Sequence, residues 1–424
     1  MKEEFLHFIF KNRLWDEDSL KLSNGKIFEI IDTGILNYDS GPDFFNAKIK
    51  IDETVWAGNI EIHINSSDWH KHNHHKDFSY DNVILHVVYN NDKLVRRSNG
   101  EEIPVWEMKF PHYLYNKYAD FKNSEKQIPC EDFLDIIEPV NKKAWFERMG
   151  VERLESKTEL IENYLEKYNS DWETAFYILL CRNFGFHINS FPFEQLALNT
   201  PLSIVRKNED SLFTLEALFF GQSGLLNNNT GDDYSIKLSE EYKFLANKYS
   251  LKPIDSKTWK FGKIRPGNMP AVRIAQLSAL MQSFQGLFSA IIDKKDIPEI
   301  YKYFNIKTSD YWKTHYNFGK PVDKTNISFG KSAFEIIMIN TIAPFRLIYS
   351  KIYSNSYEEI SVKWLDEIKA ENNRITKVWK DLGIKPDTAF DSQALIHLKN
   401  NYCDKKKCLY CNIGTAIFRE FGKL

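Results

Sequence analysis

Histidines are concentrated in one short part of the chain, between residues 63 and 86. Six of the eleven histidines in the 424-residue sequence lie in this window. Carboxylates stand close by in sequence, among them Asp43 and Glu61. Imidazole and carboxylate are the two commonest ligand classes for a divalent metal. The window therefore predicts a metal site.

The first candidate ligands lie on a predicted strand over residues 59–65. Isoleucines fill its even positions, whereas Glu61 and His63 fall on odd positions and share the opposite face. Asp43 follows a Gly-Pro turn at the start of the preceding strand, so a hairpin could bring it beside Glu61. Two interpretations stay open: an active-site wall, or a turn cap and a solvated face.

The polar segment behind this strand, residues 68–77, holds four more histidines. As a helix it would place alternative ligand sets on two faces: His70, His74 and Asp77, or Asp68, His72 and His75. We favour His72 and His74 as further ligands of the metal. Manganese, magnesium and zinc are the candidate ions, and a site rich in nitrogen ligands favours manganese or zinc over magnesium. A solvated helix is the alternative. His86, on a strand apolar on both sides, is expected to be buried with one hydrogen-bond partner.

Three cysteines near the C-terminus form a second candidate site. They are Cys403, Cys408 and Cys411, with lysines between them that favour the thiolate. Zinc in a tetrahedron or an iron–sulfur cluster needs a fourth ligand, for which we favour Cys130 over His397 or Cys181. Free thiols are the alternative. A structural role that ties the C-terminus down is favoured over a redox role.

A basic segment with interleaved aromatics predicts a nucleic-acid-binding surface. Its cations are Lys257, Lys260, Lys263, Arg265 and Arg273, and Trp259 and Phe261 lie among them. Lysine and arginine bind phosphates, and aromatic rings stack on bases. The alternative is a solvated loop before a helix.

The order of elements predicts an α+β protein. A short N-terminal helix precedes five strand-like runs, over residues 26–35, 44–51, 54–64, 83–89 and 103–110. Beyond a polar connection the pattern is helical almost throughout. We therefore expect an α/β domain with a mixed sheet over residues 1–127 and a larger helical domain over residues 128–424.

Composition narrows the class of protein. The formal net charge of −2 excludes a globally basic chain, so nucleic acid would have to meet a local patch. The first residues lack a signal-peptide pattern, and no apolar run is long enough for a membrane span. We expect a soluble, cytoplasmic protein that does not contact a membrane. Its oligomeric state is not set by the sequence.

The succession of Pro-Asp, a strand and Glu-x-His resembles the PD-(D/E)XK nuclease superfamily. The resemblance implies a restriction-endonuclease-like domain in which Asp43 and Glu61 hold a divalent cation and Glu3 or Glu4 supplies a helical acid. His63 occupies the place of the usual lysine, and Lys48 could take over that role. Some nucleases of this superfamily carry an iron–sulfur cluster with one cysteine far upstream, which Cys130 resembles.

Segments along nearly the whole chain identify it as a member of an uncharacterised bacterial family, domain of unknown function 2851. They include Gly41 to Phe44, Gly58 to His63, Leu85 to Tyr89, Glu216 to Gly221, Arg265 to Asn268, Asp391 to Leu395 and Tyr402 to Gly414. Membership implies no activity. Our leading hypothesis is a metal-dependent nuclease-like phosphodiesterase. The alternatives are an inactive nucleic-acid- or protein-binding module of the same fold, and a metal-dependent hydrolase of a small substrate.

Overall fold

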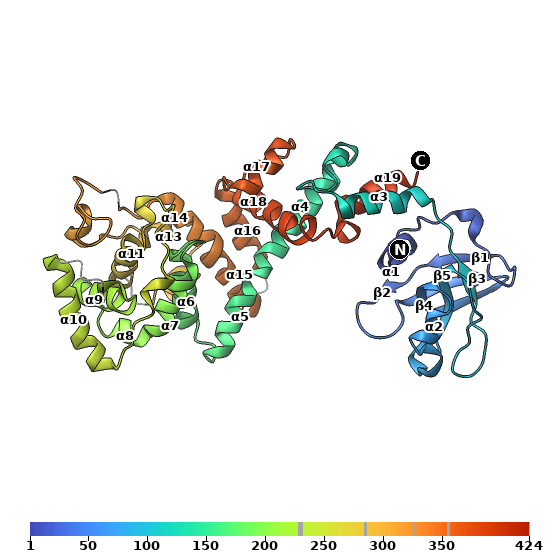
Figure 1. The fold of residues 1–424 in the computed structure, drawn as a ribbon, viewed down its shortest axis with the longest axis horizontal. Helices are drawn as coiled ribbons and strands as arrows, with labels where there is room; N and C mark the ends of the chain where they lie inside the picture. The colour runs from blue at the N-terminus through green and yellow to red at the C-terminus, as the bar shows by residue number, and fades with distance from the viewer. Residues whose placement is uncertain (228–231, 284–285, 326, 354–356, 424) are drawn as a thin grey trace. The chain divides into compact units, whose positions relative to one another are not determined.

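The computed structural model describes residues 1–227, 232–283, 286–325, 327–353 and 357–423. The chain forms two compact units (Figure 1). The first consists of Met1–Trp145 together with Leu398–Leu424, and the second of Phe146–His397. The first unit therefore extends past the expected boundary near residue 128 and includes the C-terminal residues.

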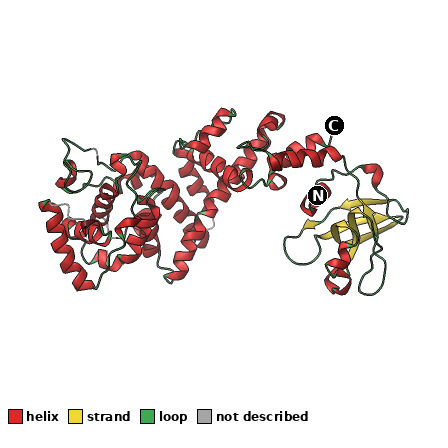
Figure 2. Cartoon of the chain, viewed as in Figure 1, coloured by secondary structure: helices red, strands yellow, loops and turns green. Residues whose placement is uncertain are grey.

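A six-stranded mixed sheet forms the centre of the first unit (Figure 2). The strands are β1 (Phe28–Asp32), β2 (Ile35–Leu36), β3 (Phe44–Ile51), β4 (Thr54–Asn65), β5 (Val83–Asn90) and β6 (Val105–Glu107). Their order is β1-β3-β4-β5-β6, and β2 pairs with β3. The pairs formed among β1, β2, β3 and β4 are antiparallel, whereas β5 runs parallel to β4 and to β6. The sheet and the helices confirm the predicted α+β class.

The parallel pairing of β4 with β5 explains why the histidine-rich segment lies where it does. Two parallel strands cannot be joined by a tight turn and need a crossover connection. Here the crossover carries α2 (Asp68–Lys71) and the 3-10 turns His74–Lys76 and Phe78–Tyr80. It packs Trp69 and Tyr80 into a small buried cluster with residues of β5. The crossover thus covers part of the sheet with histidine side chains.

The N-terminal and C-terminal segments both pack within the first unit. Helix α1 (Glu3–Lys11) buries Phe10 against Phe44 of β3, with ring centroids 5.0 Å apart. Helix α19 (Asn412–Phe421) places Phe418 5.3 Å from Phe8 of α1. Helix α3 (His112–Asn123) and the 3-10 helix η4 (Glu131–Ile136) complete this unit. Aromatic contacts between distant segments therefore fasten both ends of the chain.

In the described residues of the second unit, helices joined by loops make up the regular secondary structure, apart from isolated bridges. Helix α4 (Pro139–Ser156) leads into it. The others are α5 (Thr158–Lys167), α6 (Trp172–Phe184), α7 (Ser190–Asn199), α8 (Leu202–Arg206), α9 (Leu212–Gln222), α10 (Asp233–Tyr249), α11 (Pro270–Ser283), α12 (Leu287–Ile292), α13 (Ile297–Tyr303), α14 (Lys331–Ile337), α15 (Ala343–Tyr353), α16 (Tyr357–Glu367), α17 (Arg374–Asp381) and α18 (Ala389–Leu398). Among the described helices, none is both long and apolar enough to cross a membrane.

Candidate metal centre

Glu61 and His63 share one face of β4, and both are almost completely buried. The two residues keep only 4% and 1% of their surface exposed. Glu61 Oε1 lies 3.5 Å from His63 Nε2 and 3.2 Å from Nε2 of His74 in the crossover. The expected alternation is present, but the face is not solvated, because the crossover covers it.

The crossover supplies two further histidines through a break in its helix. Helix α2 ends after one turn, and Asn73 adopts a left-handed conformation with φ of 65°. This reversal brings His72 and His74 to the same place, a combination that neither face of a continuous helix would give. His72 Nδ1 lies 3.1 Å from His63 Nε2. The expected continuous helix over residues 68–77 is therefore wrong, whereas the favoured pair of histidines does meet His63.

The three histidines place ligand atoms close enough to share one cation. One nitrogen each of His63, His72 and His74 lies within 4.8 Å of the others. In a tetrahedral site with metal–ligand bonds of roughly 2.0–2.1 Å, neighbouring ligand atoms are about 3.3 Å apart. The separations of 3.1, 3.2 and 3.5 Å among these nitrogens and Glu61 Oε1 are close to that value. The geometry suits three imidazoles around a single ion, and Glu61 Oε1 lies close to two of them.

His86 on β5 orients the central ligand. Its Nε2 lies 2.9 Å from His63 Nδ1, and the ring is completely buried. If His63 Nδ1 carries the proton and donates it to His86, the lone pair on His63 Nε2 points at the other candidate ligands. Such a hydrogen bond on the far nitrogen commonly fixes the tautomer of a metal-bound histidine. The expectation of a buried His86 with one partner holds among the described residues.

Asp43 and two residues of α1 adjoin the histidine cluster. The hairpin between β3 and β4 lets the Asp43 amide donate to Glu61 Oε2 at 3.1 Å, while Asp43 Oδ2 accepts from the Ile62 amide at 2.8 Å. His7 Nε2 lies 3.2 Å from the same Asp43 oxygen. Glu3 lies one helical turn before His7. Burial raises the pKa of the Glu3 carboxyl, and the nearby charge of Asp43 raises it further.

Glu3 rather than Glu4 is therefore the helical acid beside the site. Glu4 accepts hydrogen bonds from Tyr118 at 2.6 Å and from Lys122 at 3.1 Å, and these bonds lower its pKa. His7 was not expected from the sequence. Its position four residues after Glu3 on an amphipathic helix was the one available signal, because residues at that spacing share a helix face.

Burial dominates the electrostatics of the cluster. It raises the pKa of Glu61 to about 9, with a further contribution from the charge of Asp43. It lowers the pKa of His63 to about 2 and that of His86 to about 3, and neighbouring histidines add to the effect on His63. A divalent cation reverses this balance, because it favours an ionised carboxylate and unprotonated imidazoles.

One side of the cluster opens to solvent. His72 is exposed, whereas His63, His74 and Glu61 are buried. Two other histidines of the window, His70 and His75, contact each other instead, with ring centroids 4.8 Å apart and ring planes tilted by 57°. A ligand or substrate would therefore approach from the side of His72.

Comparison with known proteins gives the family. The model of DUF2851, described as a protein of unknown function, matches residues 3–374. The chain belongs to the DUF2851 family. No curated protein and no solved structure matches it.

The DUF2851 chain keeps Lys48 away from the carboxylates. Lys48 on β3 is exposed and pairs with Ala57, four residues before Glu61 on β4. At roughly 3.3 Å per residue this places its backbone about 13 Å along the strand from Glu61. In the described part of the chain, no lysine forms an ion pair with Asp43 or Glu61. A lysine in the catalytic position is thus absent from this arrangement.

The cysteines of the DUF2851 chain are all buried and unpaired by disulfides. Among the described residues, the four at 130, 403, 408 and 411 do not form a set of ligand atoms as tight as that of the three histidines. The described residues therefore do not show the ligand set that the expected zinc site or iron–sulfur cluster would need.

The basic segment divides into exposed and buried cations. The exposed residues are Lys257, Lys260, Lys263 and Arg265. Arg273 on α11 is buried, donates to Gln276 at 2.8 Å and to Asn268 at 2.6 Å, and lies over the ring of Phe186. The guanidinium of Arg273 therefore makes its contacts inside the protein. Of the predicted cations, the ones that a phosphate could reach are those from Lys257 to Arg265.

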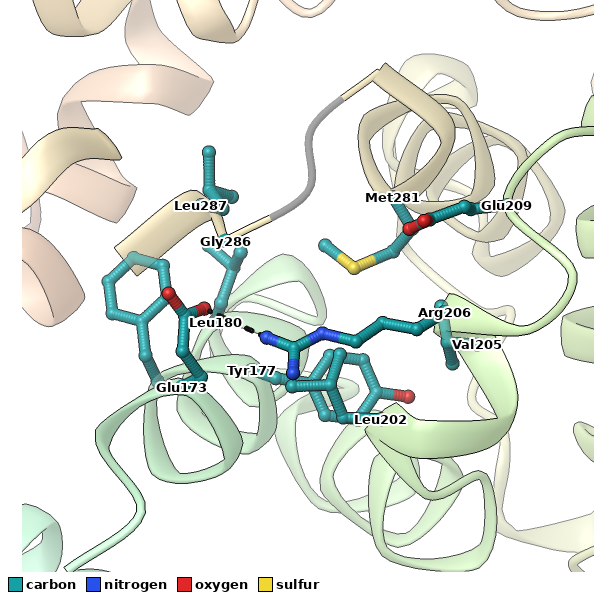
Figure 3. Close-up of a pocket in the computed structure, with 11 residues that line it drawn as sticks. Glu173, Tyr177, Leu180, Leu202, Val205, Arg206, Glu209, Met281, Gly286 and Leu287 are labelled. Carbon is teal, nitrogen blue, oxygen red and sulfur yellow. Dashed lines mark ion pairs between the residues drawn. The ribbon is translucent and has the colours of Figure 1, made fainter. Parts of the chain in front are cut away.

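A hollow in the helical unit is too small to hold a substrate (Figure 3). Its cavity measures about 20 Å³ and lies between α6, α8 and the start of α12. Arg206 and Glu173, which line it, are paired at 3.6 Å. That volume holds about one water molecule. A second hollow of about 440 Å³ in this unit is lined by residues of α4, α5 and α15 and by His397. Among the described residues, however, three candidate metal-ligand atoms lie within 4.8 Å of one another in the histidine cluster.

Proposed function

We propose that this DUF2851 protein is a divalent-metal-dependent phosphodiesterase that acts on nucleic acid. The observation that carries the proposal is the position of Glu61. One carboxylate oxygen faces His63 and His74, and the other accepts from the backbone of Asp43. A cation held by the histidines and Glu61 would thus have a second carboxylate, that of Asp43, beside it.

Each residue has a role that its contacts support. His63, His72, His74 and Glu61 hold the cation, which lowers the pKa of a bound water and polarises a phosphoryl oxygen. Asp43 keeps His7 in place through the 3.2 Å contact with its Nε2. Burial lowers the pKa of His7, but the hydrogen bond and charge of Asp43 outweigh burial and raise it. An imidazole paired with a carboxylate is suited to accept a proton from water.

Nucleic acid is proposed as the substrate on two grounds. First, the order of elements is similar to that of PD-(D/E)XK nucleases. A helix with an acid at Glu3 is followed by antiparallel strands with Asp43 and Glu61, and then by a parallel strand. In addition, Lys257, Lys260 and Lys263 are exposed, as phosphate binding requires. The proposal departs from that superfamily in using imidazoles where a lysine is usual.

A second candidate is a binding module of the same fold without catalysis. The observation in its favour is that Lys48 does not reach the Asp43 and Glu61 carboxylates. If a lysine is indispensable for the reaction, the centre would hold a metal for structure or recognition alone.

Metal analysis together with a cleavage assay tests the proposal. Purified wild type should carry manganese, zinc or iron, and Glu61→Gln and His74→Ala should lose most of it. His112→Ala is the matched control, because His112 is exposed on α3. Full metal retention in both cluster variants would overturn the centre.

The cleavage assay uses end-labelled single- and double-stranded DNA and RNA with each metal. We expect wild type to cut at least one substrate, and Asp43→Asn to retain the metal but lose cleavage, because Asp43 is placed beside the cation and not around it. Metal binding without cleavage by wild type would favour the binding module. Hydrolysis of a small phosphodiester alone would favour a small-substrate hydrolase.

A further inference from the structure

Two segments of the second unit that are far apart in sequence, residues 185–191 and 255–265, are joined by a pair of hydrogen bonds. The side-chain amide of Asn189 donates to the Lys260 carbonyl at 3.0 Å, and its oxygen accepts from the Lys260 backbone N–H at 2.9 Å. Asn189 is only 3% exposed, so water does not compete for these bonds. The two segments therefore form one fixed surface.

Trp259 anchors the second of these segments to the helical core. Its ring is buried and lies 5.1 Å from the ring of Phe193, and its Nε1 donates to the Ser223 carbonyl at 2.9 Å. Asp255 closes the preceding turn by accepting from the Lys257 backbone N–H at 2.9 Å. Trp259 thus holds the segment in place and cannot itself stack on a ligand.

Large apolar side chains of the same two segments are open to solvent. Phe191 is 57% exposed, Ile188 43% and Phe261 41%. Phe191 lies two residues after Asn189, and Phe261 directly follows the residue to which Asn189 is bonded. Apolar side chains that gather on one exposed surface indicate a binding site more than single ones do.

The same segments carry a strong excess of positive charge. Residues 252–265 hold five lysines and arginines and one acid, and residues 185–191 hold no acid. Among the described residues, no carboxylate forms an ion pair with the four exposed cations of residues 255–265, which are Lys257, Lys260, Lys263 and Arg265. The surface therefore attracts a chain of negative charges such as the phosphates of a nucleic acid.

We propose that this aromatic–basic surface, made of Ile188, Phe191 and residues 257–265, binds single-stranded nucleic acid. The lysines and Arg265 contact phosphates, and bases stack on Phe191 and Phe261, as in proteins that bind single strands without sequence preference. In a duplex the faces of the bases are covered by neighbouring bases, so the two phenyl rings could not reach them. Two of the three exposed apolar side chains are flat rings, which favours bases over lipid chains as the partner.

The proposal names the form of nucleic acid that the protein takes. It rests on the proposed function for nucleic acid as the class of substrate, but it requires no catalysis by the histidine cluster. Binding at the aromatic–basic surface and cleavage can therefore be measured separately.

Binding of fluorescent strands to the full-length protein tests the proposal. The probes are a thymidine strand of about 15 nucleotides, the same strand paired with its complement, and an abasic strand of equal length and charge. We expect the wild type to bind the thymidine strand at least about tenfold more tightly than the abasic strand, because only the former has bases to stack. It should also bind the thymidine strand more tightly than the duplex.

Variants assign this binding to the aromatic–basic surface. Phe191→Ala and Phe261→Ala should each weaken binding of the thymidine strand about tenfold and leave binding of the abasic strand unchanged. Lys260→Met should reduce the slope of log affinity against log salt concentration by about 0.7. Phe244→Ala and Lys243→Met are the matched controls, because both residues are exposed on α10, where acids lie among the lysines.

Equal binding of the thymidine and abasic strands by the wild type would overturn the proposal, even if a variant failed to fold. Tighter binding of the duplex would overturn it too, as would binding to phosphatidylserine vesicles but to no strand. Cleavage by the wild type that none of these variants affects, without preferential binding of the thymidine strand, would support the metal centre and overturn the surface. Preferential binding of the thymidine strand without cleavage, unchanged in Glu61→Gln, would support the surface and overturn the nuclease.

Discussion

We expect His86→Leu to weaken metal binding at the histidine cluster without removing any candidate ligand. His86 Nε2 lies 2.9 Å from His63 Nδ1 in a fully buried site. With leucine there, the Nδ1 proton of His63 has no acceptor, so the ring can turn or carry its proton on Nε2. Either change removes the lone pair that the cation needs.

The expected loss follows from the role of such outer hydrogen bonds. Removing one costs about 10–100-fold in metal affinity, which corresponds to about 1.4–2.7 kcal/mol. The metal-free protein should change less in stability. Leucine leaves one buried donor on His63 unpaired, but it also removes the buried His86 Nδ1, which lacks a partner among the described residues. His86→Gln offers an oxygen as acceptor near the position of Nε2 and should restore much of the affinity.

Competition against a metal chelator measures these affinities directly, and thermal unfolding with and without metal gives an independent value through the stabilisation by bound ligand. The reasoning is refuted if His86→Leu binds metal as tightly as wild type and as His112→Ala. A loss that His86→Gln does not restore would show that His86 acts through packing and not through its hydrogen bond.

Three further changes test separate parts of the structure. Asn73→Ala should lower the free energy of unfolding by about 1–2 kcal/mol and weaken metal binding, whereas Asn73→Gly should be tolerated, because φ at residue 73 is positive. Thermal unfolding and metal titration check both variants. Equal behaviour of the two variants would contradict the argument. Burial raises the pKa of Glu216 to about 7, so the wild type should lose up to about 3 kcal/mol of stability as the pH rises from 4.5 through 7. Glu216→Gln should remove that loss in denaturant titrations, and its persistence would assign the pH dependence to other groups. Arg273→Met should lower the free energy of unfolding by about 1–3 kcal/mol, because it leaves the amide oxygens of buried Gln276 and half-buried Asn268 without this donor. Lys263→Met should leave stability unchanged and reduce the salt dependence of nucleic-acid binding. The reverse pattern would contradict the assignment of Arg273 to the interior.

Local patterns in the sequence were sufficient for the class of the protein and for part of the candidate centre. Alternation over residues 59–65 is a property of any strand, so it correctly placed Glu61 and His63 on one face. The succession of two strands after Asp43 predicted the hairpin between β3 and β4 that brings its amide to Glu61. Strand ends were less well predicted: the run over residues 103–110 yields only the short β6, because edge pairing depends on neighbouring strands.

The sequence by itself determined the α+β class, the strands of the sheet and the identity of the histidines that could bind a metal, because these depend on residue type and on short-range periodicity. Only the tertiary structure decided which histidines meet. The position of His7 on α1 and the hydrogen bond between His86 and His63 require segments far apart in sequence to pack together. The backbone reversal at Asn73 is local, but a side-chain pattern with helical spacing does not reveal it. The same physical reason separates Arg273 from the exposed lysines: a side chain's burial is set by the whole fold and not by its neighbours in the chain.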